Sequence, residues 1–97
     1  MAKKKVIAKV KTPFNNIYIV HDQSIREMWF KGERDFFLQT RLDLEFPDII
    51  PMVYPQLMLG TLLIKPDPKR VLVIGLGGGH LPRQMMRLFP KTRVDVT

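Results

Sequence analysis

The sequence predicts an α+β chain, in which an antiparallel β meander is followed by a helix and then by a β-α-β unit. Through residue 42, short apolar segments alternate with turn residues at a spacing of about ten residues, which is typical of a meander. Residues 51–64 are apolar on nearly every side of a helical wheel. From residue 71 onward, an apolar segment, a glycine-rich turn and an amphipathic segment follow one another, which is the order of a β-α-β unit.

Four strands are expected in the meander, at residues 6–10, 17–20, 25–30 and 36–42. Turn-forming residues separate them at 12–16, 21–24 and 31–35. Successive side chains of a strand point to opposite faces of the sheet. In the fourth strand this alternation predicts one face with Phe36, Leu38 and Leu42 and another with Phe37, Gln39 and Arg41.

The predicted helix at residues 51–64 is apolar all round, and such a helix is expected to be buried all round. Pro51 and Pro55 fit its first turn, where a missing N–H costs little. Two prolines, Pro66 and Pro68, follow the helix and end it. We therefore expect a small antiparallel β domain at residues 1–45, and a linker helix with the start of a second domain at 46–97.

The β-α-β unit begins with a strand at residues 71–74, whose uninterrupted apolar side chains indicate that both faces are covered. A helix with Leu81, Met85 and Leu88 on its apolar side follows, with Gln84 among the polar residues opposite. A second strand opens at Arg93. Two parallel strands need further strands and helices to cover them, so we expect residues 1–97 to be the N-terminal, truncated part of a longer protein.

Composition excludes several classes of function. Cysteine is absent from the 97 residues, so disulfides, thiolate nucleophiles and cysteine-based metal sites are excluded. No apolar run reaches the roughly 18 residues that a membrane span needs, and the basic N-terminus lacks the apolar core of a signal peptide. A cytoplasmic protein without membrane contact is expected. The acids Asp43, Glu45 and Asp48 lack His or Cys partners, and we interpret them as solvated rather than as metal ligands.

The net charge of +7 is concentrated at the two ends, with +5 in residues 1–11, −3 in 12–64 and +5 in 65–97. A basic chain raises the possibility of nucleic-acid binding. The basic residues, however, have no aromatic residues interleaved with them along the sequence. We therefore favour solvated, lysine-rich ends. A nucleic acid is not an expected partner, and a nucleic-acid-binding or oligomerisation module stays the alternative.

The glycine loop is the strongest candidate for a binding site. It contains Gly75, Gly77, Gly78 and Gly79 between an apolar strand and a helix start, where backbone N–H groups and the helix dipole favour anionic groups. The loop lacks the Gly-Lys-Ser/Thr ending of a phosphate-binding loop, and His80 stands where a dinucleotide fingerprint has glycine. The remaining pattern, G-x-G-x-G, is typical of enzymes that bind S-adenosylmethionine. A purely structural turn is the alternative, and His80 is either a ligand contact or a surface or capping residue.

At this point the sequence resembles the spermidine synthase-like family, which comprises the polyamine aminopropyltransferases and their relatives. The resemblance extends from about residue 14 to 97 and is carried by Gln39 in the fourth strand, Tyr54 to Met58 opening the helix, and Arg70 to Gly79. It implies a Rossmann-like, methyltransferase-type α/β domain after the β domain. It also implies that S-adenosylmethionine or decarboxylated S-adenosylmethionine is the co-substrate. Gln39 and Tyr54 match positions that line the family's site.

Two departures from the family pattern bear on the reaction. Pro55 and Gln56 stand where the synthases have His and Glu, and Gly78 replaces an Asp of their loop. The resemblance therefore implies an aminopropyl or related group transfer to an amine or other acceptor. It implies a homo-oligomer as well, because the family's β domain takes part in subunit contacts. No catalytic residue is expected in residues 1–97, which are predicted to be inactive alone, and no metal is implied.

Overall fold

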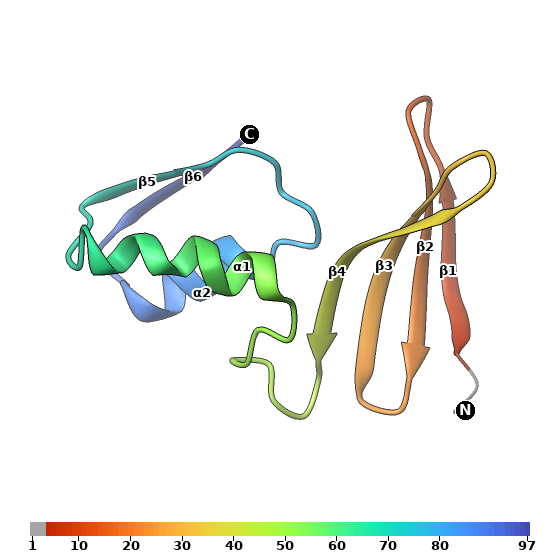
Figure 1. Ribbon diagram of the computed structural model, residues 1–97, viewed down its shortest axis with the longest axis horizontal. Helices are drawn as coiled ribbons and strands as arrows, with labels where there is room; N and C mark the ends of the chain where they lie inside the picture. Colours follow the sequence, from red (N-terminus) through yellow and green to blue (C-terminus); the bar gives the residue numbers. More distant parts are fainter. Residues whose placement is uncertain (1–3) are drawn as a thin grey trace. The chain divides into compact units, whose positions relative to one another are not determined.

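A computed structural model describes residues 4–97, which form two compact units (Figure 1). The first, here the β unit, ends at Pro51, and the second, the αβ unit, spans Met52–Thr97. The chain is of the α+β class, as predicted, because one sheet is purely antiparallel and the other is a helix-connected parallel pair.

The β unit is a four-stranded antiparallel sheet with the strand order β1-β2-β3-β4, so the predicted meander is confirmed. Its strands are β1 (Lys5–Lys11), β2 (Asn16–Asp22), β3 (Ile25–Lys31) and β4 (Phe36–Asp43). The turn after β1 is closed by Thr12, whose Oγ1 accepts the N–H of Asn15 at 2.9 Å. In the turn before β4, the N–H of Gly32 donates to the carbonyl of Asp35 at 2.8 Å.

Strict alternation fails in β4. Phe36, Leu38 and Arg41 lie opposite Lys31, Trp29 and Glu27, which are alternate residues of β3 and so share one face. The register shifts between the pairs Trp29–Leu38 and Met28–Thr40, which leaves Gln39 as the extra residue of a β-bulge. The prediction that Phe36 and Arg41 lie on opposite faces is therefore wrong, because one inserted residue reverses the alternation after it.

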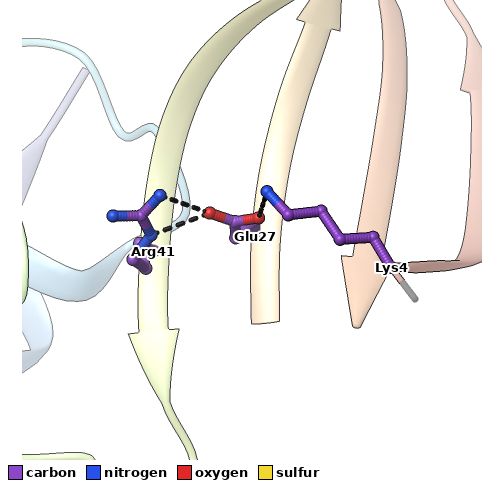
Figure 2. Close-up of polar contacts among 3 residues, drawn as sticks. All are labelled: Lys4, Glu27 and Arg41. Carbon is purple, nitrogen blue, oxygen red and sulfur yellow. Dashed lines mark hydrogen bonds and ion pairs between the residues drawn. The ribbon is translucent and has the colours of Figure 1, made fainter. Parts of the chain in front are cut away.

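A buried ion cluster joins three parts of the β unit (Figure 2). The Glu27 side chain on β3 is only 3% exposed, and its Oε1 lies 3.0 Å from Nζ of Lys4. Both Nε and Nη2 of Arg41 on β4 lie 2.7 Å from its Oε2. Burial raises the pKa of Glu27, but the hydrogen bonds and positive charges of Lys4 and Arg41 outweigh this effect and lower the pKa below 4.5.

The αβ unit contains α1 (Val53–Leu59), the 3₁₀ helix η1 (Gly60–Leu63), β5 (Arg70–Val73), α2 (His80–Leu88) and β6 (Arg93–Val96). The predicted β-α-β unit is confirmed, since β5 and β6 pair in parallel with Val71 opposite Val94. Beyond the ladder, Gly75 N–H donates to Thr97 at 2.7 Å and Arg93 N–H donates to Lys69 at 3.0 Å. These bonds hold the strands together at both ends.

The helix predicted at 51–64 is shorter and less buried than expected. The α-helical part begins at Val53, and a 3₁₀ turn replaces it from Gly60. Pro55 is its one buried residue, whereas Leu63 and Ile64 are 91% and 88% exposed. An apolar helical wheel shows what a helix can bury, but burial itself needs neighbouring elements on each side.

The fully buried apolar residues of the described chain are few. Ile50, Val73 and Met85 are 8%, 5% and 6% exposed. Val73 of β5 is buried while its neighbours Leu72 and Ile74 are 61% and 81% exposed, so one face of this strand is covered and the other is open. Within residues 4–97, no helix has the length and apolar character needed to cross a membrane.

Candidate functional site

The glycine loop connects β5 to α2 and has a backbone that depends on glycine. Gly75, Gly77 and Gly79 have φ values of 87°, 57° and 80°, which residues with a Cβ rarely adopt. The N–H of Gly79 donates to the carbonyl of Leu76 at 3.0 Å and closes the loop as a tight turn. The succession of glycines thus has a physical reason in the backbone angles.

The loop also leaves room in front of its backbone. A Cβ placed on Gly75 would meet no atom within 4 Å, and one on Gly79 would touch only Leu76 Cδ1 at 3.6 Å. Crowding within the chain therefore does not explain these glycines. A backbone that is open on its outer side is what a ligand lying close to the main chain requires.

The start of α2 adds a polar environment to the loop. Gly79 is the N-cap residue, no side chain caps the helix, and its first turn contains no acid. The first N–H groups of a helix carry a partial positive charge. Polar or anionic atoms of a ligand are therefore favoured here over cationic ones.

His80 is buried, so its interpretation as a surface or capping residue is wrong. It is the first residue of α2 and is 8% exposed, and Gln84, one turn later, is 2% exposed. Nε of Arg87 donates to Oε1 of Gln84 at 3.1 Å, which turns the amide nitrogen toward His80 Nε2 at 3.4 Å. Gln84 was predicted on the polar side of α2, but its side chain is buried beside His80, whereas Arg87 is exposed.

A groove of about 490 Å³ lies within the αβ unit. Its walls are mainly apolar, with side chains from α1, η1, β5 and α2, among them Met58, Leu62, Leu72 and Met85. Ile74, the residue that precedes Gly75, also lines it. The groove thus reaches the beginning of the glycine loop.

The predicted site residues do not all lie in one unit. The four glycines are together in the loop, and Tyr54 lies in the first turn of α1 in the same unit, with 51% of its surface exposed. Gln39 belongs to the β unit, where it occupies the bulge of β4 and its Nε2 donates to the Phe37 carbonyl at 3.3 Å. Residues 4–97 contain no cluster of three or more potential metal ligands.

Sequence comparison identifies relatives of this chain. It is 30% identical over 95 residues to a polyamine aminopropyltransferase of Vibrio vulnificus, with 94% of this chain and 31% of the relative covered. It is 34% identical over 74 residues to a polyamine aminopropyltransferase of Chromobacterium violaceum, with 76% of this chain and 27% of the relative covered. No protein-family profile matches the chain, and no solved structure is significantly similar to it.

The match to the Vibrio vulnificus relative covers 94% of the chain and therefore includes the glycine loop and most of the meander, and the other match covers 76%. The chain spans between a quarter and a third of the length of the curated relatives that it matches. The similarity agrees with the family resemblance of the strand, helix and loop motifs. The chain belongs to the spermidine synthase-like family, the polyamine aminopropyltransferases and their relatives.

Proposed function

We propose that this chain supplies the nucleoside-binding loop of a spermidine synthase-like transferase. In this proposal the Gly75–Gly79 loop lies against an S-adenosylmethionine-type nucleoside, and β5-α2-β6 is the first part of a Rossmann-like sheet. The observation that carries the proposal is the loop itself, with three positive φ values and open space where the Gly75 side chain would be. Family membership supports the same assignment.

Each part of the loop has a separate role in the proposal. The glycines let the ligand approach the backbone, and the N–H groups at the start of α2 donate to its polar atoms. The buried side chains of His80 and Gln84, with the exposed Arg87 bonded to Gln84, keep the first turns of α2 in place. When bound, the nucleoside would supply a carbon activated by its sulfonium sulfur. The acceptor amine would form a bond to this carbon as the carbon–sulfur bond breaks, which leaves a thioether nucleoside and releases the amine proton.

The loop favours a donor whose end near α2 is not strongly cationic. It contains no carboxylate between Gly75 and Gly79, and the first turn of α2 has none. An aminopropyl group carries an ammonium, whereas the amino-acid end of S-adenosylmethionine carries a carboxylate as well. The choice between decarboxylated and intact S-adenosylmethionine is therefore the question to test first.

Isothermal titration calorimetry of the full-length protein with both nucleosides tests the loop. Gly77→Asp is expected to abolish binding, because it introduces a Cβ and a negative charge where the backbone would meet the ligand. Gly60→Asp is the matched control. Gly60 has an ordinary φ of −59° and nothing within 4 Å of its Cβ position, so nucleoside affinity should not change. Unchanged affinity in Gly77→Asp would refute the site.

We further propose that residues 1–97 alone have no transferase activity. The loop and the first turn of α2 contain no carboxylate, His80 beside the loop is buried against Gln84, and Asp95 on β6 is paired with Arg93 at 3.0 Å. Incubating this chain with either nucleoside and putrescine, followed by mass spectrometry of the amine, should show no product. Transfer above the background without protein would contradict this proposal.

A further inference from the structure

One face of the meander brings lysines and aromatic rings together, although they are separated in the sequence. The strand register places Lys9, Tyr18, Trp29 and Leu38 in one cross-strand row, and Lys11, Asn16, Lys31 and Phe36 in the next row. Directly opposed residues of an antiparallel sheet share a face. Aromatic residues thus accompany the basic residues across the sheet, although not along the sequence. We call these two rows the aromatic–lysine face.

Contacts within the face orient its side chains. The Lys9 ammonium lies 5.2 Å from the centre of the Tyr18 ring, and the Lys31 ammonium lies 5.8 Å from the centre of the Phe36 ring. The Tyr18 and Phe36 rings meet edge to face at 5.3 Å. Attraction between a cation and a ring holds each lysine beside an aromatic surface.

A hollow of about 320 Å³ opens on this face. The rings of Tyr18, Trp29 and Phe36 line it, together with Lys4, Val6 and Val20. Phe36 is 52% exposed, so its ring is accessible from solvent, and Tyr18 and Trp29 are half-buried. Lys4 lies 5.3 Å from the centre of the Trp29 ring. Its Nζ is also 3.0 Å from Oε1 of Glu27 (Figure 2). The hollow is at the lower limit of small-ligand sites and has room for one planar base.

The charges of the face indicate an anionic partner. The two rows contain Lys9, Lys11 and Lys31 and no acidic residue. The acids on this side of the sheet, Asp22, Glu27 and Asp43, belong to the rows beyond, and Glu27 is neutralised by Lys4 and Arg41. Glu33 and Asp35 lie in the turn before β4. Lys9 and Lys31 each lie beside a ring that lines the hollow, and Lys11 belongs to the same face, so the surroundings of the hollow favour an anionic group next to a stacked ring.

We propose that the aromatic–lysine face binds single-stranded nucleic acid. One base stacks on the rings of the hollow, and Lys9, Lys11 and Lys31 contact phosphates on either side of it. Stacking platforms surrounded by cations are how proteins bind single strands without reading their sequence. The face belongs to the β unit, so this activity is independent of the nucleoside proposed for the glycine loop.

Trp29 allows a direct test, because it is the single tryptophan of the chain and lines the hollow. An oligothymidylate of about eight nucleotides should quench Trp29 fluorescence, since a stacked base contacts the indole or its neighbours. Three phosphate contacts predict a slope near −2 for log K against log salt, so that binding weakens about 20-fold between about 50 and 200 mM salt. Quenching that is absent or independent of salt would overturn the proposal.

Matched variants locate the binding. Phe36→Leu removes a ring of the hollow and should weaken oligothymidylate binding about tenfold. Phe14→Leu removes a ring that is 90% exposed in the turn after β1 and should have no effect. Lys9→Gln and Lys31→Gln should each lower the salt slope by about 0.7, whereas Lys91→Gln in the αβ unit should leave it unchanged. Far-UV circular dichroism checks that each variant is folded.

Three results would overturn the assignment. The first is equal affinity of Phe36→Leu and Phe14→Leu for the oligonucleotide. The second is equal binding of a duplex of the same length, because a duplex offers charge but no unstacked base. The third is a dimer that Phe36→Leu dissociates without nucleic acid, because the face would then be covered by a second copy of the chain.

Discussion

At the scale of single residues, Glu27 shows how a buried charge is accommodated in a thin sheet. Its carboxylate is 3% exposed, while Lys4 and Arg41 remain 42% and 37% exposed. Burial of an unpaired carboxylate would cost free energy, and the two cations offset that cost through three close contacts. The cluster therefore connects the segment before β1 to β3 and β4 through one side chain.

Removal of the Glu27 charge should destabilise the β unit. Glu27→Gln keeps the size of the side chain but leaves Lys4 and Arg41 without an anionic partner, at a cost of about 1–3 kcal/mol in the free energy of unfolding. This is less than the 3–5 kcal/mol typical of fully buried pairs, because both cations still reach solvent. Urea denaturation measures the difference. Glu33→Gln, in the exposed turn before β4, is the control and should change stability by less than about 0.5 kcal/mol.

The lowered pKa of Glu27 predicts the pH dependence of this contribution. The folded chain binds the carboxyl proton less readily than the unfolded chain, so the stabilisation is present above about pH 4.5 and is lost as the pH falls through the folded pKa. The stability difference between the wild type and Glu27→Gln should therefore be constant near neutral pH and should shrink below about pH 4.5. A difference that grows on acidification would contradict this assignment.

At the scale of elements, the connection between β5 and α2 depends on backbone angles that only glycine adopts easily. Both Gly75 and Gly60 have room for a Cβ. A side chain at Gly75 would be strained by the φ of 87°, whereas Gly60, between α1 and η1, has an ordinary φ of −59°. The two positions therefore differ in backbone strain and not in space. This separation allows a test of the loop that requires no ligand.

Gly75→Ala should destabilise the αβ unit by about 1–3 kcal/mol, because alanine at positive φ is strained. Gly60→Ala should instead be neutral or stabilising by about 0.4–1 kcal/mol, because alanine restricts the unfolded chain and fits the native angles. The midpoint of thermal or urea unfolding compares the two variants. If both alanines have the same effect, the positive φ is not what makes Gly75 necessary.

At the scale of the whole molecule, exposed apolar surface indicates self-association. In the αβ unit, Leu57, Leu63, Ile64 and Ile74 are each more than 70% exposed, and exposed apolar surface of this extent is typical of interaction sites. The chain alone is therefore proposed to form oligomers through the αβ unit. The other possibility is that the αβ unit stays mobile while the β unit remains folded.

Sedimentation velocity tests the oligomer, and the species observed should be larger than a monomer of 11.3 kDa. The double variant Leu63→Lys with Ile64→Lys should shift the distribution toward the monomer, because both side chains are almost fully exposed. Phe14→Lys, at an equally exposed position of the β unit, should not. A monomer with sharp, dispersed amide signals for residues 70–97 would show that the apolar surface does not drive association.

Elements defined by local patterns could be predicted from the sequence. The four strands of the meander and the β-α-β order were predicted because apolar periodicity and turn residues act over a few positions. The glycine loop could be located for the same reason, since successive glycines between a strand and a helix have few structural explanations. The family could also be inferred from the sequence, because the motif from Arg70 to Gly79 is one continuous segment that can be read without the tertiary structure.

The positions of side chains relative to other elements were decided by the tertiary structure alone. The bulge at Gln39 moved Phe36 to the face of Arg41, because one inserted residue exchanges the faces of a strand. Pairing across strands brought Lys9 to Tyr18 and Lys31 to Phe36, which no spacing along the chain indicates.

The burial of side chains was also decided by the tertiary structure. Leu63 in a wholly apolar segment is exposed, and Gln84 on a polar side of its helix is buried. Local sequence determines which conformation a segment adopts, because the interactions within a helix, strand or turn reach only a few residues. Exposure, by contrast, depends on which elements pack against a side chain, and those elements come from distant parts of the chain.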